Sequence, residues 1–245
     1  MSFANKLMQA YFNYAYNPVY DFATARLNRY RKLQESCIGK LEFEDKDRVL
    51  CVGLGTGNEV FHILRTNASV SIVGIDYSHT ALQKAYKKAL RLGREIEVLI
   101  MDARSLDLAN GSFDKVLCIH VMDFVEENEK VTDEILRVLK DGGQFVITYP
   151  SEKEGARLGL NLLKDGIRHN VNSRKNRIKI LLESLAQMLV GIVYLPLLFR
   201  PKRKSYSRRE LEAMITRLTT ADFQIEEDSV YQDFIVYGRK LTEGG

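Results

Sequence analysis

The sequence predicts an α/β protein built on a doubly wound, mostly parallel sheet. Short apolar runs, typical of buried strands, lie at 48–53, 70–75, 96–101, 115–120 and 143–149. Segments with the apolar spacing of helices lie between them, at 58–67, 79–92 and 128–140. Strands that alternate with helices favour parallel pairing, with helices on both faces of the sheet.

Single residues mark several of the predicted ends. Ser78 is placed to accept a hydrogen bond at the start of helix 79–92, and Gly93 is placed to end that helix. Asp141-Gly142-Gly143 predicts a tight turn into the fifth strand.

The remaining segments complete one predicted domain, 1–245. Residues 1–40 have helical spacing and many aromatic side chains, with Pro18 between two helices, so we expect an N-terminal helical cap. A helix at 207–219 and strands at 223–228 and 230–240 follow residue 206. The segment 151–205 has no strand pattern, and we expect it to be a helical lid inserted after the fifth strand.

Composition favours a globular protein of the cytoplasm. The chain of 245 residues is 45% hydrophobic, enough for a sizeable core. Its start lacks a basic region followed by an apolar core and a cleavage site, so we expect no secretory signal. The three cysteines, Cys37, Cys51 and Cys118, lack metal-ligand spacing. We expect them to be reduced and buried, and we predict no metal site.

The basic charge gathers in one segment. Residues 151–210 hold 14 Lys and Arg against 5 Asp and Glu, a net charge of +9, whereas the whole chain carries +4. Within it, 185–199 is almost wholly apolar, but its 15 residues are too few to cross a bilayer of about 30 Å. An apolar segment between basic runs predicts contact of 168–204 with an anionic membrane surface. The alternative is a buried lid helix with a solvated basic face.

A glycine turn follows the first strand. Val49 to Val52 are apolar, and Gly53-x-Gly55-x-Gly57 leads into a helix, which predicts a nucleotide-binding element. Two acids stand at further strand ends. Asp76, nineteen residues past Gly57, is placed to accept from a ribose diol, and Asp102 is placed to accept from an exocyclic amine.

With these motifs in order between Val49 and Thr148, the chain resembles the class I S-adenosylmethionine-dependent methyltransferases. The resemblance implies a Rossmann-like sheet of seven strands with an antiparallel last strand, and S-adenosylmethionine as cofactor. It implies these cofactor contacts: Gly53, Gly55 and Gly57 at the amino-acid end, Asp76 at the ribose, Tyr77 on the adenine face, Asp102 and Ala103 at the adenine edge, and His120 and Val121 beside the methyl group. Many members carry an acid where this chain has Cys51, which leaves Glu59 as a substitute contact.

Methyl transfer needs an oriented acceptor and, for some acceptors, a base. His120, Asp123 and Tyr149 are polar candidates at strand ends, with His120 either a general base or a pocket wall. The stretch 17–32 resembles the start of quinone and phospholipid methyltransferases. That resemblance implies that Tyr16, Tyr20 and Asp21 cover the reaction site. Tyr20 is therefore a catalytic candidate, in addition to His120 and Tyr149.

We expect a lipophilic small-molecule acceptor of the quinone, phospholipid or isoprenoid type, methylated by a cytoplasmic enzyme at the membrane surface. The alternatives are a soluble metabolite, an RNA bound through the basic segment, or cofactor binding without catalysis. No nucleic acid partner is expected, because 120-HVMDF-124 lacks the Asn/Asp-Pro-Pro-aromatic stretch of enzymes that methylate base amines.

Overall fold

The computed structural model describes residues 10–17, 20–21, 28–65, 69–152, 204–218, 221–228 and 233–241. Positions 12, 28, 29 and 218 are described by their backbone alone. The predicted lid 151–205 and the predicted membrane segment 168–204 lie almost entirely outside the described residues, and so does Pro18. Among the described residues, no helix is long and apolar enough to cross a membrane.

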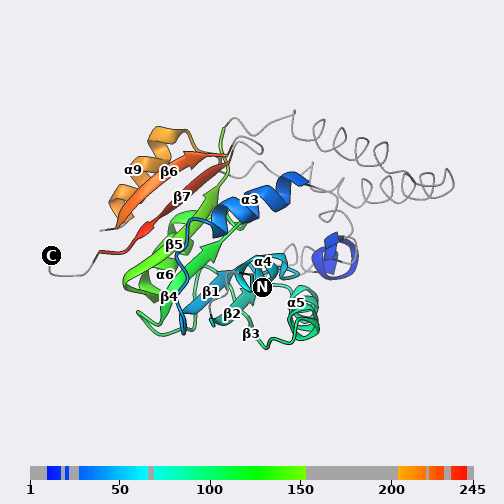
Figure 1. Cartoon of the computed structure of the whole chain (residues 1–245). Coiled ribbons are helices and arrows are strands. Elements are labelled where there is room, and N and C mark those ends of the chain that lie inside the picture. Colours follow the sequence, from blue (N-terminus) through cyan, green and yellow to red (C-terminus); the bar gives the residue numbers. More distant parts are fainter. Residues whose placement is uncertain are drawn as a thin grey trace.

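A seven-stranded sheet forms the centre of the molecule, in the order β3-β2-β1-β4-β5-β7-β6 (Figure 1). The strands are β1 (Arg48–Val52), β2 (Ser71–Asp76), β3 (Glu97–Ile100), β4 (Phe113–Cys118), β5 (Leu139–Tyr149), β6 (Asp222–Glu227) and β7 (Phe234–Arg239). β7 pairs antiparallel with both β5 and β6, while the pairs among β1 to β5 are parallel. The predicted doubly wound sheet with an antiparallel last strand is confirmed.

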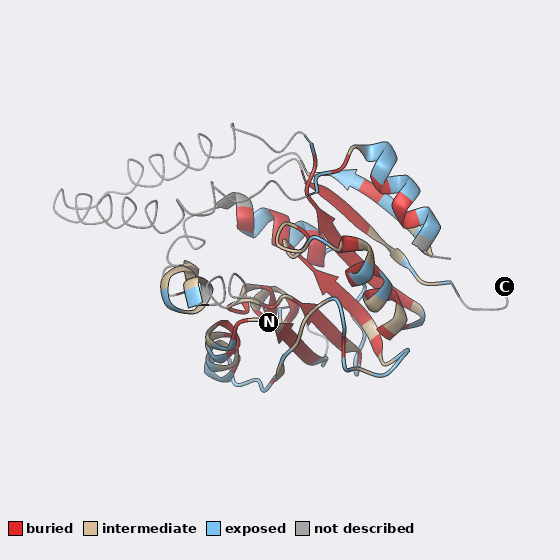
Figure 2. Ribbon diagram, turned by 180° about the vertical axis from the view of Figure 1, so that it is seen from behind, coloured by how far each residue is buried: buried red, intermediate tan, exposed pale blue. Residues whose placement is uncertain are grey.

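Helices cover both faces of this sheet (Figure 1). The helices of the described residues are the π-helix η1 (Phe12–Tyr16), which lies beside α5, and the α-helices α3 (Asn28–Ile38), α4 (Asn58–Ile63), α5 (His79–Arg91), α6 (Asn128–Val138) and α9 (Arg208–Leu218). One core cluster packs the sheet against α3, α4 and α5, and the other packs it against α6 and α9. Figure 2 shows the buried residues gathered along the strands between these two layers.

β1 shows why an apolar run forms the central strand. Successive side chains of a strand point to opposite faces. Leu50 and Val52 accordingly join the cluster that holds α6 and α9, whereas Val49 and Cys51 join the cluster that holds α3, α4 and α5. A strand buried on both faces needs apolar residues at each buried position, and Val49 to Val52 supply them.

Some predicted boundaries are wrong. The fifth strand begins at Leu139 instead of 143, because Leu139 already pairs with Phe113. The next pair is Lys115 with Gln144, so the predicted turn at 141–143 is a bulge inside β5, with Gly142 at φ 74°. The predicted helix 58–67 ends at Ile63, and the fourth strand ends at Cys118 instead of 120.

The predicted ends of α5 are confirmed. The Ser78 hydroxyl accepts a hydrogen bond from the Ala81 amide at 3.2 Å, which satisfies one of the free donors of the first turn. Gly93 follows the helix at φ 70°, a left-handed conformation that glycine adopts without steric penalty.

Gly57 and Gly93 form a matched pair for testing the packing of the glycine turn. Both have positive φ, but a Cβ at Gly57 would lie 2.7 Å from Ala85 Cβ, whereas a Cβ at Gly93 would meet no atom of the described residues within 4 Å. Gly93→Ala should lower the free energy of unfolding by about 1 kcal/mol through backbone strain alone. Gly57→Ala should cost about 1–3 kcal/mol more, because α4 must move away from α5. Urea unfolding without ligand measures both values, and equal losses would contradict this account.

Candidate active site

The glycine turn between β1 and α4 places three glycines in the left-handed region, with φ of 67° at Gly53, 57° at Gly55 and 77° at Gly57. Their surroundings differ. A Cβ on Gly53 would lie 2.2 Å from Val121 Cγ2, and one on Gly57 would collide with Ala85. Among the described residues, a Cβ on Gly55 would have only the Gly53 carbonyl oxygen within 4 Å, at 3.9 Å. Gly53 and Gly57 are thus required by close packing, whereas a side chain at Gly55 would meet no such contact in the described part of the chain.

The carboxylate of Asp76, at the end of β2, holds this turn in place. Its Oδ2 accepts a hydrogen bond from the Gly55 amide at 2.8 Å, and its Oδ1 accepts one from the Ser78 amide at 2.7 Å. Burial raises the pKa of Asp76 above its ordinary value, against the lowering effect of these amides. Each carboxylate oxygen has a second lone pair, so the group keeps acceptor capacity for a diol.

The predicted adenine-binding residues follow β2 and β3. Tyr77 and Ala103 are half-buried. Asp102 is bound by Arg104, whose Nε lies 2.9 Å from Oδ1 and whose Nη2 lies 2.5 Å from Oδ2. This guanidinium holds the pKa of Asp102 below its ordinary value, and Arg104 also binds Glu127 at 3.0 Å. Arg104 was not among the predicted site residues, although a basic residue two positions after the acid could have indicated it.

The described part of the N-terminal segment lies over the same strand ends. Asp21 Oδ1 accepts hydrogen bonds from Thr56 of the glycine turn at 2.5 Å and from Lys88 of α5 at 2.7 Å. Asn17 donates to the Ser78 hydroxyl at 2.7 Å, and that hydroxyl lies 2.5 Å from Asn13 Oδ1. η1 accordingly lies beside α5 (Figure 1). These hydrogen bonds link the N-terminal segment to the glycine turn and to α5, which Asp76 also joins to each other.

His120 lies just past the end of β4, on a backbone with φ 55°. Its amide donates to Thr148 Oγ1 at 2.8 Å, and its ring stacks on Tyr30 with 5.4 Å between centroids. Tyr20 donates a hydrogen bond to the Tyr30 hydroxyl at 2.7 Å. Two of the three catalytic candidates, His120 and Tyr20, therefore belong to one aromatic cluster.

Acidic groups surround His120. Its Nδ1 lies 3.3 Å from Asp123 Oδ2 and 3.5 Å from Asp233 Oδ2. Glu59, buried on the first turn of α4, accepts a hydrogen bond from Gln34 at 2.6 Å. Burial raises the pKa of Glu59. Asp233 and Gln34 were not among the predicted site residues, because neither belongs to a sequence motif.

Tyr149 lies elsewhere. Its side chain is fully buried in the core beside Tyr206, and its hydroxyl lies 2.7 Å from Thr132 Oγ1 on α6. The interpretation of Tyr149 as a residue facing the reaction site is wrong, because its position along β5 turns it toward the α6 layer. Its interactions are those of a packing residue.

The cysteines are buried, as predicted. Burial raises the thiol pKa of Cys37, Cys51 and Cys118 above the ordinary value. A thiol held neutral is a poor nucleophile, so these side chains act as small apolar core residues.

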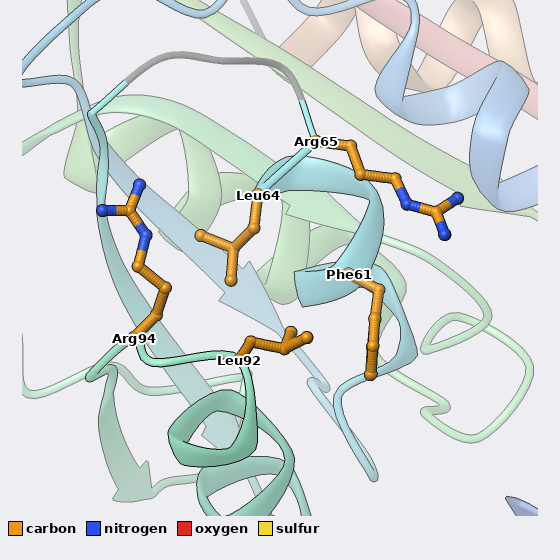
Figure 3. A pocket seen from close by; sticks show the side chains of 5 residues that line it. All are labelled: Phe61, Leu64, Arg65, Leu92 and Arg94. Atoms are coloured by element: carbon orange, nitrogen blue, oxygen red, sulfur yellow. The ribbon is translucent and has the colours of Figure 1, made fainter.

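A separate hollow of about 360 Å³ lies past the C-terminal ends of α4 and α5 (Figure 3). It is lined by Phe61, Leu64, Arg65, Leu92 and Arg94. None of the predicted site residues lines it, so it is distinct from the strand-end cluster.

Comparison with known proteins shows which proteins this chain is similar to. Residues 50–147 match the family described as Methyltransferase domain. A phosphatidylethanolamine N-methyltransferase of Cereibacter sphaeroides is 39% identical over 102 residues, which cover 41% of this chain and 49% of the relative. The ubiquinone/menaquinone biosynthesis C-methyltransferase UbiE of Geotalea daltonii is 31% identical over 139 residues, which cover 53% of this chain and 57% of the relative.

Solved structures share the fold. A SAM-dependent methyltransferase from Aquifex aeolicus superposes with a TM-score of 0.57 at 16% identity, covering 85% of this chain and 89% of that one. This chain spans about half the length of the curated relatives it matches. Residues 50–147 therefore match a methyltransferase domain, and the chain shares its fold with a solved SAM-dependent methyltransferase.

Proposed function

We propose that this chain is an enzyme that transfers the methyl group of S-adenosylmethionine to a lipophilic small-molecule acceptor. The observation that carries the proposal is the Asp76 carboxylate, which holds the glycine turn and keeps acceptor capacity beside Gly55. The acceptor class rests on similarity to a phosphatidylethanolamine N-methyltransferase and a quinone C-methyltransferase.

In this proposal the cofactor lies across the ends of β1, β2 and β3. Asp76 accepts from the ribose hydroxyls, Tyr77 packs on the adenine, and Gly55 permits close approach of the amino-acid end. Asp102 and the Ala103 amide form hydrogen bonds with the edge of the adenine. Arg104 then shares the Asp102 carboxylate with the adenine amine, because two of its nitrogens already bind that group. The cofactor supplies an activated methyl carbon, so the protein mainly has to bind and orient.

His120 is the proposed general base, and Tyr20 is proposed to cover the acceptor together with Tyr30. The support is their grouping past β4, next to Val121, which itself contacts the glycine turn. The 168–204 contact with an anionic membrane surface lies outside the described residues and stays a prediction from the sequence.

Asp76→Asn should weaken S-adenosylmethionine binding by about 2–4 kcal/mol, on the order of 30- to 1,000-fold in Kd. The amide loses the negative charge that strengthens hydrogen bonds from the ribose, and it turns a donor toward Gly55 or Ser78. Isothermal titration calorimetry measures the change.

Asp114→Asn is the matched control for Asp76→Asn. Asp114 also accepts a hydrogen bond from a backbone amide, that of Arg48 at 2.9 Å, but it lies at the opposite ends of the strands. Its replacement should leave the Kd within twofold. An unchanged Kd for Asp76→Asn would remove the ribose assignment.

The acceptor class is tested with methyl-labelled S-adenosylmethionine and vesicles of phosphatidylethanolamine, or of anionic phospholipid that carries a demethylated quinone. Label should enter the organic extract with wild-type protein and not with Asp76→Asn. Protein should float with the anionic vesicles at low salt, and less protein should float with them at high salt, because salt screens the charge attraction.

Label that enters only the water-soluble fraction of a cell extract would replace the lipophilic acceptor by a soluble metabolite. Label in RNA would favour the nucleic acid alternative. If the protein does not float with the vesicles, only the predicted contact of 168–204 with the membrane surface is contradicted.

A further inference from the structure

Asp233 is a fully buried acid whose Oδ2 lies 3.5 Å from His120 Nδ1. It stands directly before β7, far along the chain from every motif of the methyltransferase domain. Burial of a carboxylate is costly unless an opposite charge or hydrogen-bond donors compensate for the lost water. The imidazole of His120 is therefore a group that can compensate for the burial of the Asp233 carboxylate.

Two carboxylates approach the same nitrogen of this ring. Asp123 Oδ2 lies 3.3 Å from Nδ1, in addition to Asp233. Ionised carboxylates only accept hydrogen bonds, so Nδ1 between them carries the hydrogen. In the neutral ring the remaining nitrogen, Nε2, then has the lone pair. Nε2 is buried, which keeps bulk water from competing for it.

The ring is also fixed in direction. Tyr30 stacks on it at an interplanar angle of 18°, and the His120 amide is held by Thr148 at 2.8 Å. The backbone there has φ 55°, which is uncommon for a residue with a side chain and clusters at functional sites. These contacts fix the direction of the ring and, with the two carboxylates, the position of its hydrogen.

We propose that Asp233 is a positioning residue for His120, acting together with Asp123. This inference rests on the proposed methyl transfer. As the acceptor attacks the methyl carbon, the new acceptor–carbon bond forms and the sulfur–carbon bond breaks, with its electron pair going to sulfur. The proton of the acceptor goes to His120 Nε2, and the two carboxylates stabilise the imidazolium that results.

Other groups also face His120. Asp123 comes from the segment after β4, and the buried Glu59 comes from α4. Tyr30 comes from α3, and Tyr20 reaches the cluster through the Tyr30 hydroxyl. Asp233 differs from Asp123 in its complete burial, so its charge is less screened by water and salt.

The test uses the full chain with Asp233→Asn, which removes the charge and keeps the shape. The first measurement is nuclear magnetic resonance of the imidazoles, which needs no acceptor. The chain has four histidines, and His120→Gln identifies the His120 signals. The wild-type ring should carry its hydrogen on Nδ1, and its titration midpoint should be lower in Asp233→Asn, because a charge that stabilises the imidazolium is gone.

The second measurement is methyl transfer to the vesicles described above. Asp233→Asn should lower kcat on the order of 10- to 100-fold and leave the KM for S-adenosylmethionine within twofold. The acid limb of the kcat–pH profile should move to lower pH, since the base loses its proton more readily.

Asp47→Asn is the matched control. Asp47 is also buried, with 8% of the residue exposed. Its Oδ2 lies 3.5 Å from Lys115 Nζ, near the N-terminal ends of β1 and β4 and away from His120. It should change neither the His120 titration nor the kcat–pH profile. If Asp233→Asn does not fold, the hydrogen position in the wild-type His120 ring decides, because a hydrogen on Nε2 would contradict the pairing of Nδ1 with Asp233.

An unchanged His120 midpoint in folded Asp233→Asn, or a wild-type ring that carries its hydrogen on Nε2, would overturn the positioning role. Wild-type protein that transfers no methyl group would overturn the proposed function instead, while the titration would still decide the pairing of Asp233 with His120.

Discussion

The site depends first on the two hydrogen bonds that the Asp76 carboxylate accepts from the Gly55 and Ser78 amides. One bond fixes the glycine turn after β1, and the other fixes the start of α5. Ser78 in turn caps α5 and binds Asn17 of the N-terminal segment. A single half-buried acid therefore sets the relative positions of the turn, of α5 and of the N-terminal segment, and a ligand at Gly55 meets a preorganised surface.

A second group of side chains lies on the other side of β1. In the order β3-β2-β1-β4-β5, the chain winds outward in both directions from β1, so the ends of β1 and β4 form the crevice where ligands bind in such sheets. Gly53 packs on Val121 at this crevice, next to His120. The two groups, Asp76 with the glycine turn and His120 with its acids, thus face each other across the ends of neighbouring strands.

Local patterns predicted the central part of the fold well. Apolar runs and glycines located β1, β2, α5 and Asp76, because these features depend on neighbours in the sequence. The start of β5 was missed, since its extra residues depend on pairing with Phe113. Tyr149 was misplaced because the side-chain direction along a strand follows from the register, which a strand end alone does not reveal. Contacts such as Asp21 with Thr56 and Asp233 with His120 join distant parts of the chain, and no local pattern records them.

The central claim is that the Asp76 carboxylate both organises the turn and binds the ribose. Calorimetry with S-adenosylmethionine and its 2′-deoxy analogue, on wild-type protein and on Asp76→Asn, separates these two effects. The account predicts that loss of the 2′-hydroxyl weakens binding to wild-type protein on the order of tenfold, and that this difference disappears in Asp76→Asn. An equal loss in both proteins would show that Asp76 only organises the turn, and would contradict the claim.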